Sequence, residues 1–359
     1  MQWKFSEEQD AYREALRGWL GDVAASDRVR AWLGVDGESA DVSPFEQRFV
    51  EDGMAGVGIA EEVGGQGGGL VELAITAEEL ARVAAPSSAW LATSLAVGAL
   101  ATRPDLASAA LEGGYAALVV AAESLLAPSA SVVVDAEGRI SGSIPRVLGA
   151  DRAALLIVPA HGADGLQLFA VDAGADGVSV STHRLLDRSR TVADVRLDGA
   201  VGESLDVDAA AVLARATDIA GVLVAADALG AMERMLELAV EYSAQRHQFG
   251  VPIGSFQAVK HAAATILVDV EAGRSAVYYA AASVDGGDPA RALHAAAVKA
   301  QVTTSAGRAA DSALTMHGAI GYTWEHDLHL YFKRARLDEQ LFGSAEVWND
   351  RIADGLALA

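Results

Sequence analysis

The sequence predicts an α+β protein with three domains: an N-terminal all-α domain at residues 1–112, a middle antiparallel β-sandwich or barrel at residues 113–206, and a C-terminal four-helix bundle at residues 207–359. Three observations predict this order. Apolar residues recur at helical spacing in the first third, short β-rich runs separated by turn residues fill the middle, and helical spacing then returns over long stretches. With 359 residues, of which 52% are hydrophobic, the chain can bury a sizeable core.

The first domain is predicted to open with an amphipathic helix. Ser6 and Gln9 have the spacing of a capping box, and apolar residues follow at helical intervals. The glycine-rich stretch VGIAEEVGGQGGG, residues 57–69, carries no Lys or Ser/Thr in Walker spacing and follows no clear strand. We therefore expect a linker there rather than a phosphate-binding loop. Helix formers dominate from that point to Ala101.

The middle domain is predicted to consist of strands. Runs rich in Val, Ile and Leu, such as AALLIVPA and LQLFAVDA, alternate with turn residues between Tyr115 and Asp206. The intervals between these runs are too short for crossover helices, which favours antiparallel pairing over a Rossmann sheet. No G-x-G-x-x-G stretch occurs there.

The last domain contains helices of bundle length before Arg246 and after Phe256. The longest apolar stretch begins at Ile219, is broken by Asp227, and is shorter than the roughly 20 uninterrupted apolar residues of a membrane span. We therefore expect no membrane partner. Since acids rather than an apolar run follow Lys4, no secretory signal is visible, and we expect a cytoplasmic protein.

Composition argues against several functions. The net charge of -22 argues against nucleic acid as a partner, because such binding relies on clustered Lys and Arg that release counterions. With no Cys there is no disulfide, thiolate nucleophile or Cys-ligated metal. His317, His326 and His329 lack the spacing of a helical metal set, so no metal is predicted. The composition does not argue against small acyl or carbonyl substrates.

Two C-terminal motifs suggest a ligand site. In QRHQFGVPIGSFQ, Arg246 and Phe249 stand at a helix end and Gln257 begins the next helix. A guanidinium beside an amide and an aromatic ring suits a nucleotide pyrophosphate; the alternative is that Arg246 caps its own helix and Phe249 packs. Gly318 lies in a glycine turn that either lets backbone N–H groups approach a ligand or simply joins two helices.

With these motifs in this order, the chain resembles the acyl-CoA dehydrogenase flavoproteins over essentially its whole length. The resemblance implies FAD at a subunit interface. The Arg of R-x-x-F-G, the following Gln and the glycine turn of one subunit hold the ADP half of a neighbour's FAD in that family. The matching positions here are Arg246, Phe249, Gln257, Thr315, Gly318 and Ala319.

The chain also departs from the family pattern. The turn from Thr315 lacks the family's Gln-x-x-Gly-Gly, and AAESLLAPSAS and IPRVLGADRA stand where the family has its Thr-Glu-Pro-Gly-x-Gly-Ser-Asp loop and Trp-Ile-Thr-like strand around the flavin ring and thioester. In the family, the Glu of Tyr-Glu-Gly-Thr removes the substrate α-proton while the flavin takes the β-hydride. The ungapped match LFGS puts Phe342 at that position, so we predict no catalytic residue in this chain.

This pattern resembles the non-catalytic subunit of the heterotetrameric (α2β2) acyl-CoA dehydrogenases of actinobacterial steroid catabolism. It implies a homologous catalytic partner that binds most of a steroid-derived acyl-CoA, FAD shared at the interface, and an electron-transfer flavoprotein as acceptor. The chain alone would be inactive. Two alternatives stay open: a competent homo-oligomeric dehydrogenase whose base is Asp218 or Glu346, and a flavin-free scaffold or acyl-binding protein.

Overall fold

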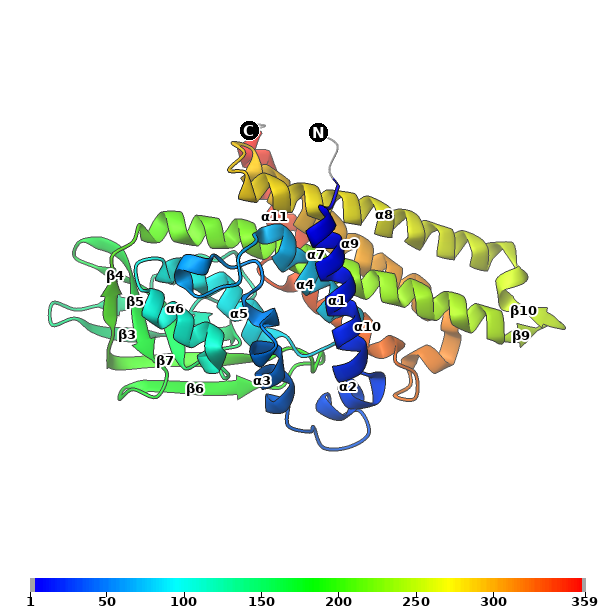
Figure 1. Ribbon diagram of the computed structural model, residues 1–359, viewed down its shortest axis with the longest axis horizontal. Helices are drawn as coiled ribbons and strands as arrows, with labels where there is room; N and C mark the ends of the chain where they lie inside the picture. The colour runs from blue at the N-terminus through cyan, green and yellow to red at the C-terminus, as the bar shows by residue number, and fades with distance from the viewer. Residues whose placement is uncertain (1–3, 357–359) are drawn as a thin grey trace.

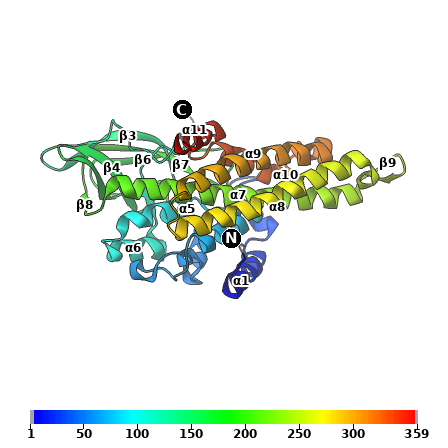
Figure 2. The same ribbon diagram turned by 90° about the horizontal axis from the view of Figure 1, so that it is seen from above.

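The computed structural model describes residues 4–356 and confirms the predicted order of helices, sheet and helices. The sheet lies at one end of an elongated molecule, and the long C-terminal helices extend to the other end (Figures 1 and 2). The N-terminal helices pack against this bundle, chiefly through α4, which contacts both α7 and α8. Of the buried apolar clusters, one large cluster lies mainly in the helical parts, a second lies in the sheet, and a small third surrounds Trp348.

The N-terminal domain begins with the expected capped helix. The Gln9 N–H donates to Ser6 Oγ at 3.2 Å and the Ser6 N–H donates to Gln9 Oε1 at 3.0 Å, which confirms the capping box. Arg17 of the first helix forms an ion pair of 2.6 Å with the buried Glu79 of the fourth. The helices are α1 (Glu7–Val23), α2 (Ser26–Trp32), α3 (Ser43–Glu51), α4 (Leu70–Arg82), α5 (Ser88–Ala96) and α6 (Pro104–Ala109).

The middle domain is one mixed sheet in the strand order β6-β7-β3-β2-β4-β5-β8, with β1 paired to β4. Most pairs are antiparallel as expected, but β1 and β2 each pair with β4 in parallel. The segment 119–132, which contains no helix and is partly buried, joins these two strands. The strands are β1 (Ala116–Leu118), β2 (Val133–Val134), β3 (Arg139–Leu148), β4 (Leu155–Gly162), β5 (Gly165–Asp172), β6 (Val178–His183), β7 (Val192–Val201) and β8 (Glu203–Leu205).

In the part of the chain that the structure describes, the C-terminal domain consists of three long helices, α7, α8 and α9, and two shorter ones, α10 and α11, both of which pack on α9. α7 runs from the sheet to the hairpin β9–β10 at the far end of the molecule (Figures 1 and 2). The elements are α7 (Ala209–Gln245), β9 (His247–Gln248), β10 (Val251–Pro252), α8 (Gln257–Asp285), α9 (Arg291–His317), α10 (Leu328–Gln340) and α11 (Ala345–Gly355).

Within the described residues, α7 is the one helix long and apolar enough to cross a membrane, so the break expected at Asp227 does not interrupt it. Of its most apolar 18-residue window, however, 67% is buried inside the fold. Asp227 lies at the middle of this helix and forms an ion pair with Arg334 of α10. α7 is therefore the central core helix, and its apolar length reflects contact with other elements of the chain.

Candidate functional site

The R-x-x-F-G motif forms the hairpin β9–β10 at the far end of the bundle. The Arg246 N–H caps α7 by donating to the Tyr242 carbonyl at 2.9 Å, and the Arg246 carbonyl accepts from the Ile253 N–H at 2.8 Å. The Arg246 side chain is exposed. Phe249 has a left-handed backbone, with φ of 54°, and is 93% exposed, with its ring 6.0 Å from that of Phe256. The alternative interpretation expected Phe249 to pack. Its ring instead lies outside the core.

A groove of about 530 Å³ opens beside this hairpin, between the start of α8 and the end of α9. Of the six predicted cofactor residues, Phe249 and Thr315 line it. The other four are exposed on adjoining segments and do not line it: Arg246, Gln257, Gly318 and Ala319. The fold therefore brings all six to one end of the bundle, although they come from three separate helix ends.

The groove wall carries a hydroxyl and an acid, and a glycine turn adjoins it. The Thr315 hydroxyl donates to the Asp311 carbonyl at 2.8 Å and keeps its lone pairs for another donor. The Asp311 carboxylate, which also lines the groove, is paired with Arg336 at 2.5 Å, so its negative charge is partly compensated. Gly318 ends α9 with φ of 65°, a conformation that a side chain would strain.

These residues fit the ADP half of an FAD. A pyrophosphate calls for cationic and N–H donors, which Arg246 and the backbone of the Gly318 turn can supply. A nucleotide ring system calls for an aromatic surface, which Phe249 and Phe256 provide. Because Phe249 is almost fully exposed, this surface can cover such a ligand from one side alone.

Phe342 lies in the core at the turn between α10 and α11, 2% exposed and with a left-handed φ of 58°. Its N–H donates to the Ala122 carbonyl at 2.6 Å, and its carbonyl accepts from Trp348 Nε1 at 3.0 Å. Trp348 is fully buried and so close to α7 that a Cβ on Gly221 would lie 3.0 Å from its ring. Phe342 and Trp348 therefore fill the space beneath this turn.

The segment 121–131 closes the same region from the sheet side. Besides the Ala122 carbonyl, it contributes Leu125, which packs on the cluster of Trp348, Ala296 and Ala300. This is the segment that stands where the family has its flavin-ring loop. Two of the departures from the family pattern, Phe342 and the segment 121–131, thus lie in direct contact.

Lys299 holds the Phe342 turn from α9. Its ammonium donates to the carbonyl of Asp338 at 2.9 Å and to that of Gly343 at 3.1 Å. Burial lowers the pKa of Lys299 to about 8, although the neighbouring acids Asp338 and Glu339 oppose that shift. The Lys299 side chain thus provides the hydrogen-bond donor for two backbone carbonyls that would otherwise be buried without one.

Asp338 is fully buried beside an ion-pair network that the sequence did not reveal. Arg334 donates to both carboxylate oxygens of Asp227 at 2.7 Å, and Arg190 also pairs with Asp227. Burial, and next the charge of Asp227, raise the pKa of Asp338 well above its ordinary value. Asp338, whose carboxyl oxygens have no hydrogen-bond partner among the described residues, thus lies against a structural network that joins α7, α10 and the loop before β7.

The two acids considered as relocated bases are placed differently. Asp218 is buried and paired with Arg351 at 2.6 Å and Arg291 at 3.6 Å. Glu346 is exposed in the first turn of α11. Neither carboxylate points free into a cavity described for this chain, which weakens the case for a relocated base.

Family models cover most of the chain. The acyl-CoA dehydrogenase N-terminal domain matches residues 6–103, and the acyl-CoA dehydrogenase C-terminal domain matches residues 211–357. Among characterised relatives, acyl-CoA dehydrogenase IpdE2 of Mycobacterium tuberculosis is 32% identical over 95% of this chain and 98% of its own length. Acyl-CoA dehydrogenase FadE34 of the same organism is 32% identical over 97% of this chain, which spans about half (48%) of FadE34.

Solved structures agree with this likeness. The Tcur3481-Tcur3483 steroid ACAD superposes with a TM-score of 0.87 at 28% identity, over 98% of both chains. The ChsE4-ChsE5 complex from Mycobacterium tuberculosis gives a TM-score of 0.88 at 25% identity, over 100% of both chains. Helical domains, the central sheet and the bundle all have counterparts in these structures.

Proposed function

The chain belongs to the acyl-CoA dehydrogenase family, and on that premise we propose that it is the supporting subunit of a heteromeric FAD-dependent acyl-CoA dehydrogenase. In this proposal a homologous catalytic subunit supplies the base and binds most of the acyl-CoA. This chain supplies one side of the ADP-binding surface for FAD at the interface between the two subunits. The chain alone is inactive.

One observation carries the proposal: the N–H of the buried, left-handed Phe342 donates to Ala122. Through this contact the turn that bears the base in the family and the segment that faces its flavin ring are closed on each other. An apolar side chain there avoids burying an unpaired carboxylate. The surface formed by Arg246 and Phe249, by contrast, is exposed to solvent, which is consistent with a surface that a partner subunit covers in the complex.

The division of roles follows from this asymmetry. In this arrangement the partner's base would take the α-proton of the thioester, and FAD held between the subunits would supply the hydride-accepting chemistry at the β-carbon. A double bond forms between the two carbons, and the electrons pass on to an electron-transfer flavoprotein in the cytoplasm. Likeness to the Tcur3481-Tcur3483 steroid ACAD and to the ChsE4-ChsE5 complex supports a steroid-derived acyl group and an α2β2 assembly.

Expressing the chain alone and with candidate partner dehydrogenases tests the proposal. We expect a colourless protein alone and a yellow, active complex of equal subunit ratio with the correct partner, measured by flavin absorbance and subunit mass. A chain that is yellow and active alone would instead establish a homo-oligomeric enzyme. A complex without flavin would establish a scaffold.

Within a yellow complex, Arg246→Ala tests the ADP-binding surface. We expect flavin content per complex to fall, because a pyrophosphate loses its guanidinium partner. Arg196→Ala is the matched control, since Arg196 is an exposed arginine of the sheet that is 70% accessible. Equal flavin content in both variants would remove Arg246 from the site.

A further inference from the structure

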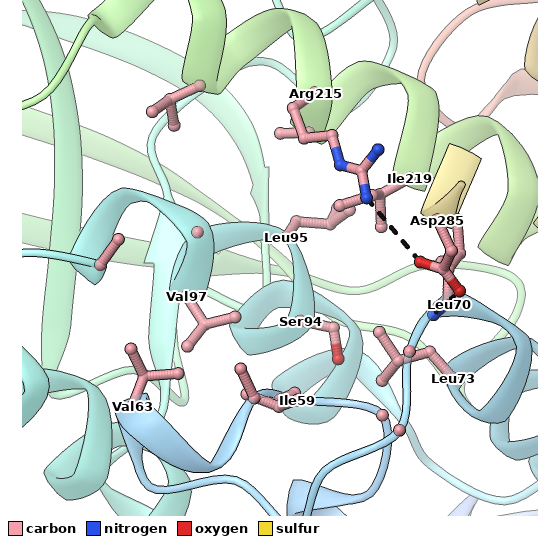
Figure 3. Close-up of a pocket in the computed structure, with 18 of the residues that line it drawn as sticks. Ile59, Val63, Leu70, Leu73, Ser94, Leu95, Val97, Arg215, Ile219 and Asp285 are labelled. Carbon is pink, nitrogen blue, oxygen red and sulfur yellow. Dashed lines mark hydrogen bonds and ion pairs between the residues drawn. The ribbon is translucent and has the colours of Figure 1, made fainter. Parts of the chain in front are cut away.

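A second cavity, of about 550 Å³, lies between the glycine-rich stretch 57–69, α5 and the N-terminal half of α7 (Figure 3). Its walls are mainly aliphatic, with Ile59, Leu73, Leu95 and Ile219 among the side chains that face it. Its volume falls in the range of small-molecule sites, roughly 300–1,000 Å³. The stretch that the sequence indicated as a linker is thus one wall of a cavity.

This cavity is separate from the Phe342 turn. The α7 residues that line it, including Val212, Arg215 and Ile219, recur at intervals of three and four and form one helix face. Gly221, which meets Trp348, points to another face of the same helix. The body of α7 therefore stands between the cavity and the filled site at Phe342.

Glycines shape the wall and leave its interior free. Gly58 has φ of 88°, and a Cβ there would lie 2.6 Å from Leu73 Cγ and 2.7 Å from the Gly69 carbonyl, so glycine lets the loop pack on α4. At Gly98 the opposite holds. Gly98 is an exposed lining residue, and a Cβ on it would meet no atom within 4 Å, so a side chain can be added there at the cavity edge without a clash.

One polar pair stands at the end of the cavity next to α8. Arg215 Nη2 and Asp285 Oδ1 are 3.8 Å apart, too far for a direct hydrogen bond (Figure 3). Asp285 Oδ2 accepts from the N–H groups of Leu70 at 2.7 Å and Val71 at 3.3 Å, capping α4. From residues 4–356, Asp285 Oδ1 accepts no hydrogen bond, while Arg215 Nη1 donates to the Val284 carbonyl. The Arg215 and Asp285 side chains are 42% and 32% exposed, so this end of the cavity also meets solvent.

We propose that this cavity binds an elongated neutral molecule with an apolar body and a single terminal hydroxyl, whose oxygen bridges Arg215 and Asp285. The hydroxyl oxygen would accept from the guanidinium and donate to Asp285 Oδ1, so one group satisfies both sides of the 3.8 Å gap. The aliphatic walls bury the rest of the ligand.

The charges at this end favour a hydroxyl over an acid. Arg215 and Asp285 together are neutral, so a ligand carboxylate would meet the Asp285 carboxylate at the same distance as its cation. A ketone could accept from Arg215 but would leave Asp285 Oδ1 without a donor. Of these three groups, the alcohol is the one that matches both the donor and the acceptor.

Titration calorimetry of the full chain with decan-1-ol tests this inference. We expect saturable binding at one site, and about tenfold weaker binding of decanoate because of the charge at Asp285. Absence of saturable decan-1-ol binding, or tighter binding of decanoate, would overturn the proposal. No flavin or partner subunit is needed, so this outcome is independent of the dehydrogenase complex.

Two variants locate the site. Gly98→Leu places a side chain in the open space and should weaken decan-1-ol binding about tenfold or more. Gly18→Leu is its control, because Gly18 lies on α1, outside the cavity, and also has open space at its Cβ. Asp285→Asn keeps an oxygen to cap α4 but replaces Oδ1 by a donor, and should also weaken binding about tenfold. Folded variants that bind as tightly as the wild type would contradict the proposal.

Discussion

The backbone N–H of Phe342 donates a hydrogen bond of 2.6 Å to the carbonyl oxygen of Ala122. The bond joins the turn before α11 to the segment that leaves β1, two places where the chain departs from the acyl-CoA dehydrogenase pattern. If the chain is the supporting subunit that we propose, we expect a change of Phe342 to an acid not to give activity by itself, because each segment closes the other.

Phe342→Ala should lower the free energy of unfolding by about 3 kcal/mol, because a large buried side chain is lost. Phe342→Gly should be no less stable than Phe342→Ala, because glycine adopts the left-handed backbone at this position without strain. In an ordinary helix, by contrast, glycine lowers the free energy of unfolding by about 1 kcal/mol relative to alanine. Urea unfolding measures both. In the assembled complex, turnover per bound flavin should not change; its loss in both variants would show that Phe342 serves the chemistry.

Phe249→Ala separates assembly from folding. At 93% exposure the ring contributes little to the chain's own stability, so unfolding should shift by no more than about 0.5 kcal/mol. In the complex with a partner subunit, flavin retention after gel filtration should fall, because an aromatic surface is lost from the cofactor interface. If stability fell sharply and flavin retention did not, the hairpin would be a structural element of this chain alone.

Asp227→Asn should destabilise the chain by about 3 kcal/mol or more, because Arg190 and Arg334 would remain buried without their counter-charge. Asp198→Asn is the control: Asp198 pairs with Arg196 at 3.5 Å on the surface, and its loss should cost less than about 1 kcal/mol. Denaturant unfolding of both variants compares them directly. Equal costs would mean that the buried network adds nothing to stability.

The sequence predicts the helices well because their apolar spacing is local, and it places Gln257 at the start of α8 correctly. It does not predict the parallel pairing of β2 with β4, since pairing depends on distant partners. Asp227 is visible in the sequence as a charge in an apolar run, but its partners Arg190 and Arg334 are 37 and 107 residues away. No local pattern connects them.

The candidate site shows the same limit. The Arg246 and Thr315 segments both stand at helix ends, as their motifs in the sequence indicate, and they lie at one end of the bundle. That Thr315 lines the groove while Arg246 does not depends on side-chain packing between helices. Likewise, the match at Phe342 follows from the glycine turn, but its contact with Ala122 joins residues more than 200 apart and appears only in the fold.

Lys299 gives the stability a pH dependence of known sign. Its folded pKa of about 8 is lower than the roughly 10.4 of an unfolded chain. Between these two values the unfolded chain holds more protons at this residue, so its contribution raises the free energy of unfolding as pH rises. The contribution is complete above the unfolded pKa and is lost as pH falls through about 8.

Lys299→Met removes this contribution together with the hydrogen bonds to the carbonyls of Asp338 and Gly343, and should cost about 1–3 kcal/mol near neutral pH. The difference in unfolding free energy between wild type and variant should then widen from about pH 8 to about pH 10.4, by at most about 1.36 kcal/mol per pH unit. Urea unfolding at pH values across this window measures the difference. A difference that stays constant with pH would show that Lys299 keeps an ordinary pKa and that its ammonium is not desolvated beneath the Phe342 turn.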